Sequence, residues 1–225
     1  IEVYYKSLDN IIEYKNGANL LYNPNMETEI LTGGGRSYGL EIFAKKNHGR
    51  FTGWLSYTLS RAELKVETPF PEQTINNGRY FPANHHKLHD ISLASIVQIG
   101  KRWAASGTFN FSSGRPITLP AGKYEFEGNL VPHFQDRNQN NLPSYHRLDL
   151  SVKWNGKQLK KDGSPKRYKD YWTFVLYNVY GRANAYSLIF RKSETDSNLT
   201  EAIPFTNFDE EVLKYRDITC YHQWL

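Results

Sequence analysis

The sequence predicts an all-β fold, an antiparallel up-and-down β-barrel with about eight strands. Three observations support this prediction. Apolar and polar residues alternate with a period of two in about eight stretches, as they do along strands with two different faces. Long and short connections alternate between these stretches. No long amphipathic helix pattern is present, so helices are not expected to build the core.

The strand candidates are roughly 9–14 residues long, a length that suits tilted strands crossing a bilayer. The alternation is clearest in "RFTGWLSYTLSRAE", where Phe51, Leu55 and Leu59 share a face and Thr52 and Ser56 lie on the other. The candidates span residues 1–14, 37–46, 50–63, 88–99, 102–113, 147–154, 171–190 and 215–225. The seventh candidate contains Gly181, at which we expect a bend or a bulge.

The connections alternate in length, and the long ones are rich in polar and turn-forming residues. Tight turns are expected at 46–50 and 100–102, whereas the connection at 155–170 is longer than this alternation requires. Long connections without regular structure are expected at 16–34, 65–87, 114–145 and 192–210. Aromatic residues scattered through them suit either ligand capture or packing of the loops against one another.

The polar strand faces carry mainly Ser, Thr, Asn, Ala and Gln, and the charged residues concentrate in loops and at strand ends. Aromatic residues also lie near strand ends. This pattern favours a membrane barrel, with apolar side chains toward lipid and small polar ones toward an aqueous lumen. In that register Leu55 faces lipid and Ser56 the lumen, while Trp54 is an exception that points inward. A soluble barrel with its apolar face inside is the alternative.

The formal net charge of +5 comes from one segment. Residues 153–170 hold seven Lys or Arg and two Asp, a difference of 7 − 2 = 5. Because the positive charge is confined to this segment, no nucleic-acid partner is expected. The segment is interpreted as a solvated turn or as a contact for anionic lipid headgroups.

No group of residues predicts catalysis, so the protein is not expected to be an enzyme or to hold a cofactor. Gly33-Gly34-Gly35 precedes a strand instead of a helix, and is interpreted as a flexible loop end and not as a phosphate-binding loop. His85, His86 and His89 lack Cys or Glu at ligand spacing, so no metal site is expected.

Five segments, taken in order, resemble parts of the C-terminal half of TonB-dependent outer-membrane receptors. They are "GRSYGLEIFAKKNHGRFTGWLSYTLSRAE" (35–63), "PANHHKLHDISL" (82–93), "SGRPITLP" (113–120), "LPSYHRLDLSVKW" (142–154) and "YNVYGRANAYSLIFRK" (177–192). Each motif is short, and it is their common order that makes the resemblance specific. The resemblance covers about residues 1–192 of the chain.

The resemblance implies a roughly 22-stranded barrel in the outer membrane of a Gram-negative cell, with an N-terminal plug and a TonB-binding segment. Neither accompanying part is found in the sequence, so residues 1–225 are expected to form one β-barrel region, the C-terminal portion. The implied function is TonB-dependent uptake of a large or scarce solute. The implied partners are outer-membrane lipid, TonB through the plug, and the imported solute; a surface lipoprotein is allowed but not indicated.

The resemblance also implies that extracellular loops contact the solute. The loop residues expected to make this contact are Arg79, Tyr80, His85, Tyr124 and His133. Two alternatives remain open at this point. One is a small, self-contained outer-membrane barrel with an adhesive or structural role, since eight strands can close around a filled interior. The other is a soluble, lipocalin-like binding protein.

Overall fold

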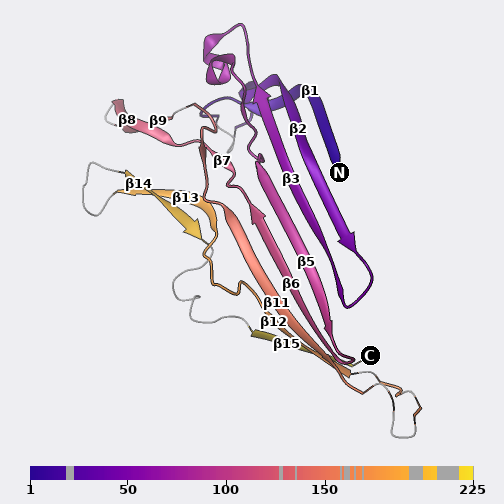
Figure 1. The fold of residues 1–225 in the computed structure, drawn as a ribbon. Coiled ribbons are helices and arrows are strands. Elements are labelled where there is room, and N and C mark those ends of the chain that lie inside the picture. Colours follow the sequence, from indigo (N-terminus) through magenta and orange to yellow (C-terminus); the bar gives the residue numbers. More distant parts are fainter. Residues whose placement is uncertain are drawn as a thin grey trace. The chain divides into compact units, whose positions relative to one another are not determined.

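The computed structural model describes residues 1–225 except 19–22, 127–128, 135, 158, 160–162, 165, 169, 193–199, 207–217 and 225. Its main feature is an antiparallel sheet in the order β1-β2-β3-β5-β6-β11-β12-β15 (Figure 1). The short β4 pairs with β3. The sheet is open, because β1 and β15 end this order without pairing to each other. The predicted all-β, antiparallel architecture is confirmed to this extent.

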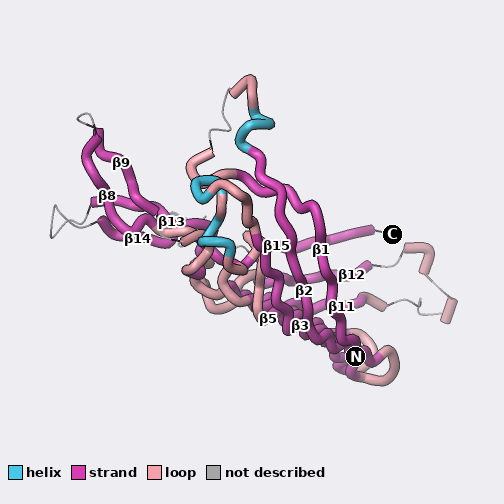
Figure 2. Tube along the Cα trace, turned by 90° about the horizontal axis from the view of Figure 1, so that it is seen from above, coloured by secondary structure: helices cyan, strands magenta, loops and turns pink. Residues whose placement is uncertain are grey.

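The strands of this sheet follow the alternating pattern. They are β1 (Glu2–Tyr14), β2 (Ile30–Lys46), β3 (Phe51–Lys65), β4 (Phe81–Pro82), β5 (His89–Ile99), β6 (Trp103–Ser112), β11 (Tyr145–Asn155), β12 (Asp170–Leu176) and β15 (Ile218–Trp224). Short two-stranded sheets pair β7 (Pro116–Ile117) with β10 (Asn140–Asn141), β8 (Pro120–Phe126) with β9 (Asn129–Phe134), and β13 (Ala185–Lys192) with β14 (Thr200–Thr206). The coiled segments, cyan in Figure 2, are the single turns η1 (Met26–Glu29), η2 (Pro71–Gln73) and η3 (Ile75–Gly78).

The interpretation of Gly33-Gly34-Gly35 as a flexible loop end is wrong. Strand β2 begins at Ile30, so all three glycines lie within it; Gly35 pairs with Leu8 and Gly33 with Ile11 of β1, and the register shifts between these two pairs. A Cβ atom at Gly33 would collide with the Lys65 carbonyl oxygen, and one at Gly35 would approach the Glu63 carbonyl oxygen to 3.1 Å. Glycine is therefore suited to the close approach of neighbouring backbones at this place in the sheet.

The stretch predicted as one strand over 171–190 forms two strands in different sheets, β12 and β13. A turn separates them, with Asn178 at φ 48° and Gly181 at φ 63°. The Gly181 N–H donates to the Asn178 carbonyl oxygen at 2.7 Å, and the Asn178 N–H donates to Asp149 Oδ1 at 2.9 Å. These bonds hold the backbone in a conformation that ends β12.

All four connections predicted to lack regular structure contain strand residues, since 16–34 includes the start of β2 and 65–87 includes β4. Residues 114–145 include β7 to β10, and residues 192–210 include β14, which pairs with β13. The β8–β9 stretch "PAGKYEFEGNLVPHF" contains two prolines and two glycines, which interrupt the alternation by which strands are identified.

The chain forms two compact units. Unit 1 comprises Ile1–Glu41, Thr58–Leu88 and Ser113–Pro143. Unit 2 comprises Ile42–Tyr57, His89–Ser112 and Ser144–Leu225. Unit 1 contains a small dry core, in which Leu64 packs against fully or nearly fully buried side chains. They are Leu31, Val66, Ile75 and Phe81.

Unit 2 contains a sheet with two chemically different faces. Directly opposed residues of antiparallel strands share a face, so the registers of β5, β6, β11 and β12 define one continuous face that is apolar except at Ser95 and His146. It carries Ile91, Leu93, Val97, Ile99, Trp103, Phe109, Phe111, Leu148, Leu150, Val152, Trp154, Trp172, Phe174 and Leu176. The opposite face carries mainly hydroxyl, amide and charged side chains. No helix in the described part of the chain is long and apolar enough to cross a membrane.

The exception noted at Trp54 has a partner. Its indole ring packs near Phe43, with ring centroids 6.3 Å apart. Phe43 alternates with Ile42 and Ala44 along β2 and so lies on the face opposite theirs. The two aromatic rings therefore pack together on the face opposite the predicted apolar face.

Candidate functional site

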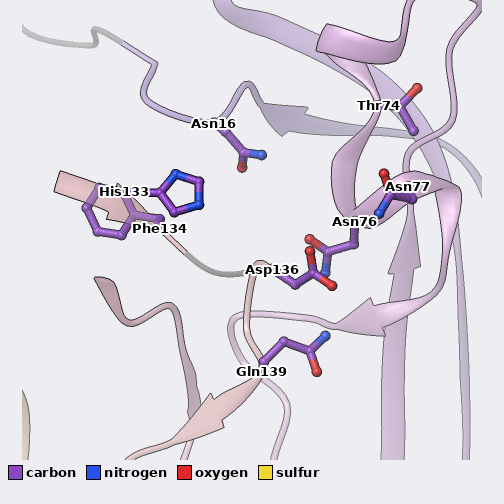
Figure 3. A pocket seen from close by; sticks show the side chains of 8 residues that line it. All are labelled: Asn16, Thr74, Asn76, Asn77, His133, Phe134, Asp136 and Gln139. Atoms are coloured by element: carbon purple, nitrogen blue, oxygen red, sulfur yellow. The ribbon is translucent and has the colours of Figure 1, made fainter. Parts of the chain in front are cut away.

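Unit 1 contains an open cavity of about 560 Å³ lined almost entirely by polar side chains (Figure 3). The lining residues come from the turn after β1, from η3 and the residue before it, from the end of β9, and from the loop that follows β9. They are Asn16, Thr74, Asn76, Asn77, His133, Phe134, Asp136 and Gln139. The cavity therefore joins parts of the chain that are far apart in sequence.

Asn76 holds one wall of the cavity in place. Its side chain is buried, and its backbone has a positive φ of 50°. The amide accepts a hydrogen bond from the Arg137 N–H at 2.7 Å and donates one to the Arg137 carbonyl oxygen at 2.9 Å. This two-way contact resembles the pairing of two strands and fixes residues 136–138 against η3.

Arg137 extends this network to the end of β1. Its guanidinium lies 3.1 Å from Glu13 Oε1 and donates to Asn16 Oδ1 at 2.8 Å. Both members of the ion pair are mostly buried, with 13% and 11% of their side chains exposed. Burial lowers the pKa of Arg137 from its ordinary value, and the negative charge of Glu13 opposes this shift.

Asn138 continues the network on the other side. Its amide nitrogen donates to the Pro82 carbonyl oxygen at 2.8 Å and to Asn84 Oδ1 at 2.7 Å. The Asn138 N–H donates to Thr118 Oγ1 at 3.1 Å. Residues 136–138 are thus bonded to three separate connections, so the cavity has a preorganised wall.

The cavity chemistry suits a neutral, polar ligand. Asn77, His133 and Gln139 are exposed and offer both donors and acceptors. The Phe134 ring, 52% exposed, supplies an apolar surface beside them. The nearby charges are paired: the Arg79 guanidinium lies 2.7 Å from Asp136 Oδ2, and Arg137 is paired with Glu13.

Of the predicted solute-contact residues, His133 lines the cavity. Arg79 does not line it but forms an ion pair with Asp136, which does. Tyr80 lies elsewhere in unit 1, with the Arg36 guanidinium 4.0 Å from the centre of its ring. His85 is exposed and does not line the cavity. The side chain of Tyr124 lies outside the described residues.

The sequence prediction missed the amide side chains of the cavity. A signal was available in "NNG" at 76–78, because consecutive Asn and Gly residues favour positive φ and turn formation. Nothing in the sequence indicated that this turn would meet residues 136–138.

His86 and His89 form hydrogen bonds within the fold. His86 Nδ1 accepts the Ala62 N–H at 3.3 Å, and His89 Nδ1 lies 3.0 Å from the Tyr57 hydroxyl. Burial lowers the pKa of His86 from 6.5; the charge of Arg61 acts in the same direction and Glu63 opposes it. Within the described residues, no three His, Cys, Asp or Glu side chains are arranged to hold a metal ion.

No family model, curated protein or solved structure matches this chain.

Proposed function

We propose that the chain is the C-terminal part of the β-barrel of a TonB-dependent outer-membrane receptor, which takes up a large or scarce solute. The observation that carries the proposal is the continuous apolar face of unit 2. Of ten large hydrophobic side chains exposed on the described parts of β5, β6, β11 and β12, eight lie on that face. Such an arrangement is stable where an apolar phase, such as lipid, covers the face.

The opposite face supports an aqueous lumen. Ser106 Oγ and Ser151 Oγ lie 2.6 Å apart, and Ser92 donates to Asn110 Oδ1 at 3.0 Å. Arg147 pairs with Asp149 along the same strand at 2.8 Å. Small, mutually bonded polar groups suit a wet interior, whereas a lipocalin-like protein would place its apolar face inside.

The open sheet supports a larger assembly. Strands β1 and β15 each pair with one neighbour in the described structure. Exposed strand edges invite pairing with further strands, and here the further strands are those of the complete barrel. The cavity of unit 1, with His133 and Asp136, contacts the imported solute in this proposal, and TonB acts through the plug.

Cysteine labelling tests the membrane assignment. Cys220 is replaced by Ser, and single cysteines are introduced at Val152 or at Ser151, which are neighbours on opposite faces. In cell envelopes, a charged maleimide is expected to label the residue-151 cysteine and not the residue-152 cysteine, which a membrane-partitioning maleimide labels instead. Labelling of both positions by the charged reagent would argue for a soluble protein.

Uptake tests the receptor assignment. Cells that produce the full-length protein are given labelled ferric siderophores, cobalamin, haem, peptides and oligosaccharides. The proposal expects uptake of one of these classes that stops when TonB is deleted. If the cysteines are labelled as expected but no solute is taken up in a TonB-dependent way, the adhesive or structural alternative is favoured.

A further inference from the structure

Three tryptophans form a row across unit 2. Trp103 of β6 is opposite Trp154 of β11, which is opposite Trp172 of β12. The row continues to Ile99 of β5, which is opposite Trp103. The rings of Trp103 and Trp154 have centroids 6.4 Å apart. All three indoles therefore lie at one end of the apolar face, in one line across the strands.

Two connections at this end of the sheet are bonded to the ends of neighbouring strands. The Gln98 N–H donates to the Arg50 carbonyl oxygen at 2.8 Å, which joins the β2–β3 turn to the end of β5. The Asn155 N–H donates to the Arg102 carbonyl oxygen at 2.8 Å, which joins the β5–β6 turn to the end of β11. The row of tryptophans therefore lies directly beside three adjoining connections.

These connections are strongly basic. In the described parts of 45–50, 100–102 and 155–170, Asp170 is the one carboxylate. The same segments carry seven exposed cations, Lys45, Lys46, Arg50, Lys101, Arg102, Lys157 and Arg167. No ion pair between described residues engages any of the seven. Their charge is thus available to a partner outside the described chain.

We infer that this end of unit 2 is a binding surface for anionic phospholipid headgroups. Indole rings prefer the boundary between hydrocarbon and headgroups, so the row sets the depth of the sheet in a bilayer. Lys101 and Arg102 lie one or two residues beyond the row, and Lys157 lies three residues beyond Trp154. These cations are then near the level of lipid phosphates, where Lys and Arg attract anionic headgroups. The inference rests on the proposed function, because it requires the apolar face to contact lipid.

Quenching by brominated lipids tests the surface. In a Trp54→Phe, Trp224→Phe background, the tryptophans that remain are those of the row. The chain is refolded into vesicles of equal phosphatidylcholine and phosphatidylglycerol, with either one or the other lipid brominated. Stronger quenching by brominated phosphatidylglycerol is expected. The variant Lys101→Gln, Arg102→Gln, Lys157→Gln is expected to reduce that preference at least about fivefold, the effect of a single charge at the surface.

A matched variant removes three cations of unit 1, with Lys6→Gln, Lys87→Gln and Arg115→Gln, and is expected to keep the preference. Equal quenching by both lipids would overturn the inference and leave the proposed function standing. No quenching by either lipid would overturn both. The inference would also be overturned if the preference for brominated phosphatidylglycerol stays unchanged in the Lys101→Gln, Arg102→Gln, Lys157→Gln variant. The same holds if the preference falls equally in the matched unit 1 variant.

Discussion

The two units bury apolar side chains in opposite ways. In unit 1, Val66, Ile75 and Phe81 are at most 1% exposed, and polar networks surround this core. In unit 2, side chains such as Leu150 and Phe174 are 42% and 45% exposed although they lie in the middle of a regular sheet. Unit 1 supplies its own dry core, whereas unit 2 presents a single layer that an apolar environment must cover.

The difference separates two kinds of stability. The contacts of the small core of unit 1 are internal, so mutations in that core should change unfolding wherever the chain is dissolved. The apolar face of unit 2 contributes through its surroundings, so mutations there should matter most where lipid is present. The four predictions below test this contrast.

The largest effect is expected in the core of unit 1. Replacing Phe81 by Ala leaves a cavity among Leu31, Val66 and Ile75, and should lower the free energy of unfolding by about 3–5 kcal/mol. Urea unfolding in detergent micelles measures it. The matched variant is Phe70→Ala, because Phe70 is 56% exposed in the same unit, and it should change stability by less than about 0.5 kcal/mol. Similar losses in both would contradict a localised core.

In unit 2, replacing Leu55 on the apolar face by Arg should reduce membrane integration, because a charge on the lipid face near the midplane costs about 2–4 kcal/mol. Ser56→Arg places the same charge on the opposite face and should be tolerated. The measurement is the fraction of chain integrated after refolding into vesicles. If both variants integrate equally well, the assignment of faces is wrong.

The sequence predicted β5 and β6 of unit 2 well, because local alternation of apolar and polar residues is enough to identify these regular strands. It failed where contacts between distant residues decide the structure. The turn at Asn178 that ends β12 depends on Asp149, and Gly33 lies within β2 where the backbone of Lys65 approaches it. His133 was identified as a loop residue, but its amide neighbours were not, because the cavity joins residues of three separate predicted connections that share no sequence period.

An intermediate loss of stability is expected when the wall of the cavity is altered at Asn76. Asn76→Gly keeps the positive φ but removes both hydrogen bonds to the Arg137 backbone, leaving buried groups unsatisfied at a cost of about 1–3 kcal/mol. Asn77→Gly is the control, because Asn77 also has a positive φ, of 55°, and is exposed. Thermal unfolding in detergent compares them. Equal stability of the two variants would show that the Asn76 amide does not hold residues 136–138.

The smallest effect is a pH dependence in unit 1. Burial, reinforced by Arg61, lowers the pKa of His86 in the folded chain below 6.5, while Glu63 opposes the shift. The unfolded chain therefore takes up the proton more readily, so stability should fall as pH drops through about 6.5. Protonation also removes the Nδ1 acceptor of the Ala62 N–H, a bond worth at most about 1.5 kcal/mol.

Comparison with His86→Gln isolates this contribution, because the Gln side-chain oxygen accepts the same N–H without titrating. Between about pH 7.5 and about pH 5.5 the wild type should lose more stability than the variant, whereas His85→Gln, at an exposed position, should follow the wild type. An NMR titration that places the pKa of His86 at or above 6.5 would contradict the prediction. A low pKa with no difference between the proteins would mean that the loop around His86 opens before the sheet unfolds, which would place the weakest part of unit 1 at its histidines and not at its core.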